Sequence, residues 1–229
     1  MNMLSEAKGL MAFWADIDAD YLLRYQEWHT CEHVPERVSI PGFLRGRRYR
    51  VADGSPHFLM MYETRTPDVL ASDAYLAALN APTDWTREAL THFRNPSRNI
   101  YRQVATAGIE GAFAAPWLTS LRFNRPGNLD GSKWVSAIAD RQGILRAQLW
   151  EVDEQVSGIQ TSERKIYGGG PGEQQYLLLV EAETPGGCGS DALDFADALM
   201  PEVAERRNQI LGSYWLEAHH NAPTTQETR

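Results

Sequence analysis

Two histidines four residues apart are the side chains of this chain best suited to proton transfer. His29 and His33 fall one turn apart on the same face of a predicted helix that runs up to Pro35, with Glu32 beside them. A histidine ring has an ordinary pKa of about 6.5, so it can accept or donate a proton at neutral pH. We therefore predict an acid–base site in which Glu32 could orient one ring, with His33 favoured because the helix ends there.

The same spacing has two other interpretations. His-x-x-Glu-His over residues 29–33 is the inverted zinc-peptidase pattern, but the helix is expected to end directly after it and no third ligand can be identified. Alternatively, one ring covers a sheet as a core residue and the other faces solvent. We expect no metal site.

The predicted strand after this helix carries arginines on both of its faces. Strand alternation places Arg47 and Tyr49 on one face and Arg48 on the other. A guanidinium can bind a carboxylate or an enolate through two hydrogen bonds. The alternation does not decide which face lines a pocket, and each arginine could instead pair with a surface acid.

These residues define a candidate site of two groups. The predicted catalytic residues are His33, His29, Tyr62 and Arg48. The predicted substrate-binding residues are Trp14, Asp16, Trp28, Arg47 and Tyr49. Proton transfer next to a carbonyl needs a base, an acid and an oxyanion stabiliser, and this set contains all three.

The elements that must position the site follow the order β-α-β-β-α-β, which is the ferredoxin-like unit. Apolar runs and turn signals predict strands at 9–17, 43–53, 57–64 and 99–107. Helical periodicity predicts helices between the acids of 18–20 and Pro35, at 68–79 and at 84–94.

The same order returns in the second half. Strands are predicted at 117–124, 144–152, 176–183 and 210–219, and helices at 130–141 and 191–207. Two such sheets would bury their apolar faces against each other. The predicted fold class is α+β, with two tandem ferredoxin-like repeats that form an intramolecular α+β barrel. Residues 1–110 and 111–220 would be the repeats, and 221–229 a disordered tail.

The halves differ in two respects. An alignment without gaps places Trp134 opposite His33, so we expect one active pocket, in the first half, and a degenerate second half. The connection 151–174 is polar and contains the glycine-rich run 168–172, which is typical of a flexible loop or lid. It lacks the spacing of a phosphate-binding loop.

Composition limits the partners. A net charge of −8 argues against nucleic acid, which is bound through a basic surface. We see no signal-peptide pattern and no apolar run long enough to span a membrane, and two cysteines are too few for a disulfide scaffold. We expect a cytoplasmic protein with a small-molecule substrate that is a monomer through its internal barrel or a homodimer.

One run of residues resembles a known superfamily. The run is Trp28-His29-x-x-Glu32-His33-x-Pro35-Glu36-Arg37, followed by Ile40-Pro41-Gly42-Phe43 and the arginine-rich strand. It resembles the dimeric α+β-barrel superfamily, near its EthD-like and uncharacterised members. The resemblance implies pockets between helices and sheet, where a histidine of the first helix often acts as acid or base. The activities implied include lactone isomerases, polyketide cyclases, quinone-forming monooxygenases, haem-dependent enzymes and stress proteins.

The leading functional prediction is an enzyme without a cofactor. It would transfer protons through histidine on a small aromatic, lactone or carbonyl-containing substrate, as an isomerase, dehydratase, cyclase or lyase. Two alternatives stay open. One is a haem- or metal-dependent enzyme of the same fold, and the other is a non-catalytic small-ligand-binding or stress-response protein.

Overall fold

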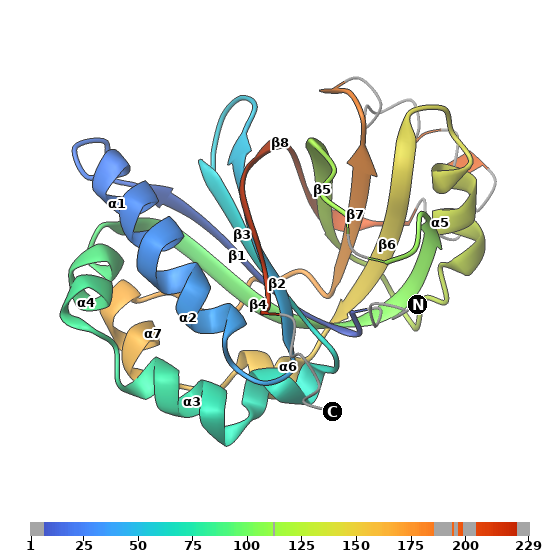
Figure 1. Cartoon of the computed structure of the whole chain (residues 1–229). Helices are drawn as coiled ribbons and strands as arrows, with labels where there is room; N and C mark the ends of the chain where they lie inside the picture. Colours follow the sequence, from blue (N-terminus) through green and yellow to red (C-terminus); the bar gives the residue numbers. More distant parts are fainter. Residues whose placement is uncertain (1–6, 112, 186–193, 195–196, 199–204, 224–229) are drawn as a thin grey trace, which may run out of the picture.

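The described residues form eight antiparallel strands that close into one barrel (Figure 1). The computed structural model describes residues 7–111, 113–185, 194, 197–198 and 205–223. The strands are β1 (Gly9–Ile17), β2 (Phe43–Val51), β3 (Phe58–Thr64), β4 (Phe93–Gly108), β5 (Trp117–Asn124), β6 (Ile144–Val152), β7 (Tyr176–Ala182) and β8 (Arg207–Asn221). Around the barrel they follow the order β1, β3, β2, β8, β5, β7, β6 and β4.

Two long strands join the halves of the barrel. β4 pairs with β1 of the first half and with β6 of the second. β8 pairs with β5 of its own half and with β2 of the first. Closure leaves no free sheet edge, so every strand has two neighbours. The predicted mixed fold with an antiparallel barrel is confirmed, and in both halves the strands stand in the order fourth, first, third, second.

Helices cover the outer face of the barrel. In the first half these are α1 (Leu22–Trp28), η1 (His29–His33), α2 (Val34–Val38), η2 (Pro67–Ala71), α3 (Asp73–Asn80) and α4 (Asp84–Leu90), and in the second half α5 (Ser132–Ala139). One apolar cluster lies under each helical layer, and a third fills the barrel interior. None of the helices that the structure describes is long and apolar enough to span a bilayer. Most of the predicted helix 191–207, and residues 224–229 of the predicted tail, lie outside the described residues.

The first helical segment does not end at Pro35, contrary to the sequence prediction. Residues 29–33 form a π-turn, in which the Val34 N–H bonds to the His29 carbonyl five residues earlier, and α2 then continues to Val38. In a regular α-helix the proline ring would clash with the carbonyl four residues before it. The wider π-turn relieves this clash, so the segment continues. Arg37 is therefore carried on the same helical layer as the two histidines.

β4 begins six residues earlier than predicted. The range 93–98 contains Pro96 and was expected to end a helix, but Phe93 and Arg94 pair with Ile17 and Asp16 of β1. A proline is tolerated in a strand where its missing N–H is not needed by a neighbour. On the side of β4 that faces away from β1, pairing with β6 begins only at Tyr101. Before that residue, the described backbone pairs through an isolated bridge between Ser97 and Gly170 of the connection.

The connection between β6 and β7 is ordered, contrary to the predicted flexible loop. It contains α6 (Glu154–Ser157) and α7 (Ser162–Tyr167), whose first turns are capped by the side chains of Asp153 and Thr161. Arg164 donates to three backbone carbonyls within the connection. Figure 1 shows α7 beside α3 and α4, so the second half of the chain supplies part of the first half's helical layer.

The barrel interior holds a ladder of ion pairs. Glu63 pairs with Arg45 and Arg47, and Glu181 pairs with Arg47 and Arg146. The two carboxylates belong to β3 and β7, so the ladder connects strands of both halves. Arginine always carries its charge, and an arginine buried without a carboxylate would lose its hydration with nothing in exchange.

Removal of one ladder carboxylate should therefore weaken the whole barrel. We expect Glu181→Ala to lower the free energy of unfolding by about 3–5 kcal/mol, because it leaves Arg47 and Arg146 without a shared counter-ion. Urea unfolding followed by circular dichroism measures this. The neighbouring exposed Glu183 is the matched control, and Glu183→Ala should leave the curve unchanged. Equal curves for the two variants would show that the ladder does not stabilise the barrel.

Candidate active site

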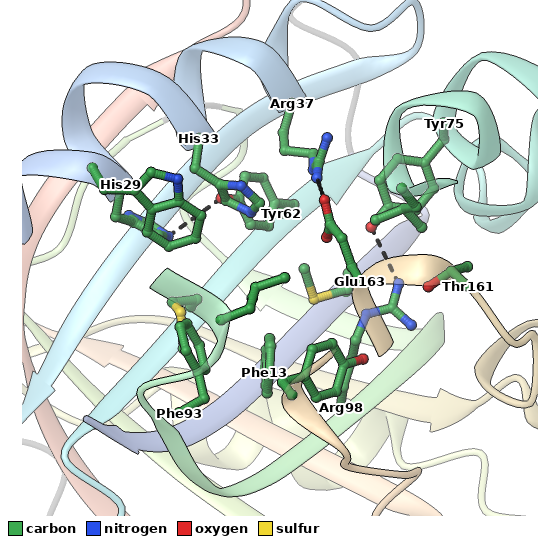
Figure 2. A pocket seen from close by; sticks show the side chains of 16 residues that line it. Phe13, His29, His33, Arg37, Tyr62, Tyr75, Phe93, Arg98, Thr161 and Glu163 are labelled. Atoms are coloured by element: carbon green, nitrogen blue, oxygen red, sulfur yellow. Dashed lines mark hydrogen bonds and ion pairs between the residues drawn. The ribbon is translucent and has the colours of Figure 1, made fainter. Parts of the chain in front are cut away.

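A pocket lies between the helices and the outer face of the first half's sheet (Figure 2). Its apolar side chains come from the strands and from three helices, among them Met11, Phe13, Met60, Leu79, Leu90 and Phe93. Polar groups stand at two ends of this apolar surface. His29, His33 and Tyr62 form one end, and Arg98, Tyr75 and Thr161 form the other. The structure thus brings four predicted site residues, Trp28, His29, His33 and Tyr62, to one pocket.

Both nitrogens of His29 are engaged. Nδ1 lies 3.1 Å from Nη1 of Arg48, and Nε2 lies 3.3 Å from the Tyr62 hydroxyl. A guanidinium can only donate, so Nδ1 accepts and the ring proton is on Nε2. Nε2–H therefore donates to the oxygen of Tyr62. The hydroxyl proton of Tyr62 remains available for a molecule in the pocket.

Arg48 acts from behind His29 and does not line the pocket. Its Nε donates to Glu217 at 2.5 Å, and Nη1 also donates to the Thr30 hydroxyl at 3.2 Å. Glu217 lies on β8 at a register shift, where Arg48 pairs with Ala218 and Tyr49 with Leu216. Such a bulge re-aims a side chain. Arg48, predicted as catalytic, therefore contacts His29 from outside the pocket.

His33 is the histidine with a free nitrogen. Its ring packs on the Trp28 indole with centroids 4.4 Å apart, and its Nδ1 is buried without a hydrogen-bond partner among the described residues. Trp28 is itself held by a hydrogen bond from Nε1 to Thr86. A buried nitrogen without a partner in an otherwise fixed environment is suited to a bond with a ligand.

Burial keeps both histidines neutral. Desolvation lowers the pKa of His29 well below 6.5, and the neighbouring Arg48 lowers it further. Desolvation also lowers the pKa of His33 well below 6.5, with a further contribution from Arg37. Burial raises the pKa of Tyr62 well above its ordinary value, so this hydroxyl keeps its proton. At neutral pH the pocket therefore holds an uncharged base beside a protonated phenol.

The sequence predicts that Glu32 could orient one histidine ring, but in the structure Glu32 has other partners. Its carboxylate accepts hydrogen bonds from Thr83 and Thr86 at the start of α4. Among the described residues, the one group of three potential ligand atoms close enough to hold a metal is Asp18, Asp20 and His92, away from this pocket. In the described part of the chain, no carboxylate joins the two rings in a group that could hold a metal, as the zinc-peptidase interpretation of residues 29–33 would require.

The pocket also carries charged side chains that the sequence analysis did not identify. Arg37 of α2 forms a buried ion pair with Glu163 of α7, and Arg98 of β4 donates to the Tyr75 hydroxyl at 3.1 Å. Burial raises the pKa of Glu163, and the adjacent Arg37 guanidinium opposes this rise. Arg37 belongs to the motif of residues 28–37, but the sequence predicts that its helix ends at Pro35. Glu163 lies in the connection that the sequence predicts to be a flexible loop.

Four predicted site residues besides Arg48 lie outside this pocket. Trp14, Arg47 and Tyr49 point into the barrel interior, where Arg47 donates to Tyr49 and pairs with both ladder carboxylates. Asp16 lies at the end of β1, where it accepts from Ser55 and Asn95. The reason is strand alternation in a closed barrel, where one face of each strand turns to the interior and cannot reach the helices.

The fold, but not the sequence, has counterparts among known proteins. No family model matches the chain, and no curated protein matches it. An anthrone oxidase-like protein superposes with a TM-score of 0.60 at 9% identity, over 97% of this chain and 96% of its own. A candidate monooxygenase from Fusobacterium nucleatum gives 0.56 at 9% identity, over 94% and 95%. A chlorite dismutase variant from Candidatus Nitrospira defluvii gives 0.53 at 13% identity, over 93% of each chain.

These likenesses define the class of fold. The chain shares an α+β-barrel fold with these proteins, in agreement with the fold that the sequence resemblance implies. At sequence identities of 9–13%, the similarity supports the fold alone. What the chain does must be argued from its own pocket.

The neutral state of His33 predicts a pH dependence of stability. Below pH 6.5 the unfolded chain binds a proton on this histidine that the folded chain does not, so the free energy of unfolding falls as pH falls. Each such histidine contributes at most about 1.4 kcal/mol per pH unit. We expect His33→Gln to flatten the stability curve below pH 6.5, as measured by urea unfolding from pH 7.5 to 5. The exposed His57 is the control, and a curve for His33→Gln parallel to that of the unmodified chain would contradict the buried neutral ring.

Proposed function

We propose that this protein is an enzyme that transfers protons through His33 without a cofactor, on a small aromatic or carbonyl-containing substrate. The observation that carries the proposal is a neutral histidine with an unpartnered nitrogen beside a protonated tyrosine. A base and a hydrogen-bond donor in one apolar pocket are what enolisation requires. The reaction classes that use such a step include isomerases, dehydratases, cyclases and lyases.

Each group has one role in this scheme. His33 accepts a proton from the carbon next to the substrate carbonyl. Tyr62 donates a hydrogen bond to the carbonyl oxygen as negative charge develops on it. His29 orients Tyr62 and is itself oriented by Arg48 and Glu217. Because Nδ1 of His29 already accepts from Arg48, we assign the base to His33.

The pocket also indicates the kind of substrate. Arg37 forms ion pairs with Glu163 and Glu36, whereas among the described residues no carboxylate lies within ion-pair distance of Arg98. Phe13 and Phe93, whose ring centroids lie 5.4 Å apart, supply an aromatic surface between the two ends. An anionic group at Arg98 would place an aromatic or carbonyl carbon toward His33. We therefore propose an aromatic acid or phenolate as the substrate class.

A second candidate is cofactor-free oxidation. It is favoured by the fold shared with an anthrone oxidase-like protein and with a candidate monooxygenase. Removal of a proton from an electron-rich aromatic substrate yields a carbanion that can pass electrons to dioxygen, so the same base would begin this reaction. Uptake of dioxygen with anthrone as the substrate, measured with an oxygen electrode, distinguishes oxidation from enolisation alone.

The haem- or metal-dependent alternative makes a different demand on the same residues. A ligand histidine needs a nitrogen that is free to bind the metal, and His29 has none because Arg48 and Tyr62 occupy both. His33 is the histidine of the pocket that could serve. Stoichiometric metal or a Soret band in purified protein would support this alternative. A non-catalytic ligand-binding role would show as binding without any proton exchange.

We extend the proposal to origin and setting. The equal strand order of the halves supports descent from one EthD-like ferredoxin-like repeat by tandem duplication, with residues 1–110 as the active half. Glu163 and Tyr167 from the second half complete that pocket. We further propose a cytoplasmic protein that binds neither nucleic acid nor membrane and acts as a monomer or a homodimer.

Replacement of His33 tests the base. Phenylpyruvate is a suitable probe because it carries an aromatic ring, a carboxylate and exchangeable protons next to a carbonyl. We expect the protein to accelerate deuterium exchange at that carbon in D2O, and His33→Gln to reduce the acceleration by about 10²–10⁴-fold. Proton NMR follows the exchange, and circular dichroism verifies the fold. Equal rates in His33→Gln and in the exposed control His57→Gln would remove the mechanism.

Replacement of Arg98 tests the anion contact. We expect Arg98→Gln to raise KM for phenylpyruvate about tenfold or more with a smaller change in kcat, since a charged hydrogen bond is lost in both ground and transition states. The exposed Arg102 on the same strand is the matched control. A fall in kcat without a change in KM would show that Arg98 does not hold the substrate.

A further inference from the structure

Arg122 of β5 is buried inside the barrel without a counter-ion. Its side chain points to the end of the barrel where β1 and β5 finish, and the residue is 6% exposed. The guanidinium lies over the Trp14 ring at 4.2 Å, and Nη1 donates to the Ser97 hydroxyl at 3.3 Å. In the described ranges no carboxylate forms an ion pair with it, whereas the three arginines of the ladder share Glu63 and Glu181.

The groups around Arg122 cannot neutralise it. Tyr101 and Tyr214 are titratable groups that act on its charge, and burial raises the pKa of both hydroxyls, that of Tyr214 to about 12. Both phenols therefore stay protonated and uncharged. A buried charge without a partner is strongly unfavourable, and arginine cannot escape it by losing its proton. Such a site is completed by an anion.

One edge of the guanidinium is free to receive that anion. Nη1 donates to the Ser97 hydroxyl, and the Trp14 indole covers one face of the guanidinium. Nε is buried with no hydrogen-bond partner among the described residues. Nε and the adjacent Nη2 present two parallel N–H groups, which is the fork that matches the two oxygens of a carboxylate. The stacking on Trp14 holds the plane of this fork in place.

The glycine-rich run of the connection lies against the same end of the barrel. Gly170 pairs with Ser97, and a Cβ on Gly172 would come within 2.7 Å of the Ser97 hydroxyl. A side chain at Gly172 would displace the group that holds Arg122. The glycines singled out in the sequence thus allow the backbone to approach the Arg122 site, and Gln174 is buried beside them.

We propose that Arg122 binds a small organic carboxylate at this end of the barrel, in a second site separate from the candidate active site. Ser97 faces the barrel interior, whereas the next residue, Arg98, lines the pocket on the helical face, so the two sites lie on opposite faces of β4. The second site does not depend on the proposed catalytic function. Its ligand needs two oxygens in one plane and a small size.

Acetate titration tests the second site. Because Arg98 is itself an anion contact of the pocket, the comparison is made in the Arg98→Gln background. We expect the melting temperature of Arg98→Gln to rise and saturate as acetate replaces chloride at constant ionic strength and pH. In the double variant Arg98→Gln/Arg122→Gln the rise should disappear. A persistent rise in the double variant, or none in Arg98→Gln, would overturn the proposal.

Two further measurements keep the test decisive if Arg122→Gln does not fold. Arg122→Lys keeps the charge but loses the two-pronged edge, so it should bind acetate at least tenfold more weakly. Line broadening of ¹³C-acetate measures this affinity. Inorganic phosphate, which is tetrahedral, should give a smaller response than acetate at equal concentration. Equal affinity of Arg122→Lys, or an equal response to phosphate, would overturn the assignment to a carboxylate.

Discussion

The hydrogen bond from Arg48 to His29 is the interaction on which the candidate active site depends. A guanidinium can only donate, so this contact determines that Nε2 of His29 carries the proton. Tyr62 therefore accepts from His29, and its own hydroxyl proton stays available for a molecule in the pocket. Arg48 can do this only because Glu217 holds it from the other side. Glu217 belongs to the last strand, so the site's tautomer depends on closure of the barrel by the pairing of β8 with β2.

Charged side chains are arranged differently on the two faces of the sheet. Inside the barrel, arginines and glutamates form a ladder that ties the halves together and leaves little freedom for chemistry. On the helical face, the two histidines are neutral because burial opposes their protonation. A neutral base in an apolar pocket can take a proton from carbon, and a fully paired arginine ladder cannot. Arg122 is the interior arginine that belongs to neither arrangement.

Proteins that share this fold are described by quite different activities, and the present pocket shows how that can be. The barrel supplies the outer face with Tyr62 and Arg98, and the helices and the connection supply further polar groups. Here the connection between β6 and β7 contributes Glu163 to the first half's pocket. A different connection on the same barrel would leave the histidines in place and change the charge and shape of the cavity. The charge and shape of this pocket therefore depend on segments outside the barrel as well as on its strands.

Much of the framework was determined by the sequence itself. Apolar runs and turn signals predicted β1 with its observed ends, and β2 and β3 to within two residues. A spacing of four placed His29 and His33 together on one side of a helical segment. Local patterns of this kind depend on backbone geometry and on which face is apolar, and both are properties of neighbouring residues. The continuation of the helix through Pro35 was missed because a π-turn has no comparable signal.

The partners of these residues were decided only by the tertiary structure. Alternation separates Arg47 from Arg48, but it cannot say that Arg47 meets the ladder and Arg48 meets His29, since both faces of a barrel strand can be buried. Glu217 and Glu163 reach the first half from distant parts of the chain, through a strand register and a helical connection that form only when the barrel closes. Contacts of this kind depend on long-range pairing, and no short stretch of sequence encodes them.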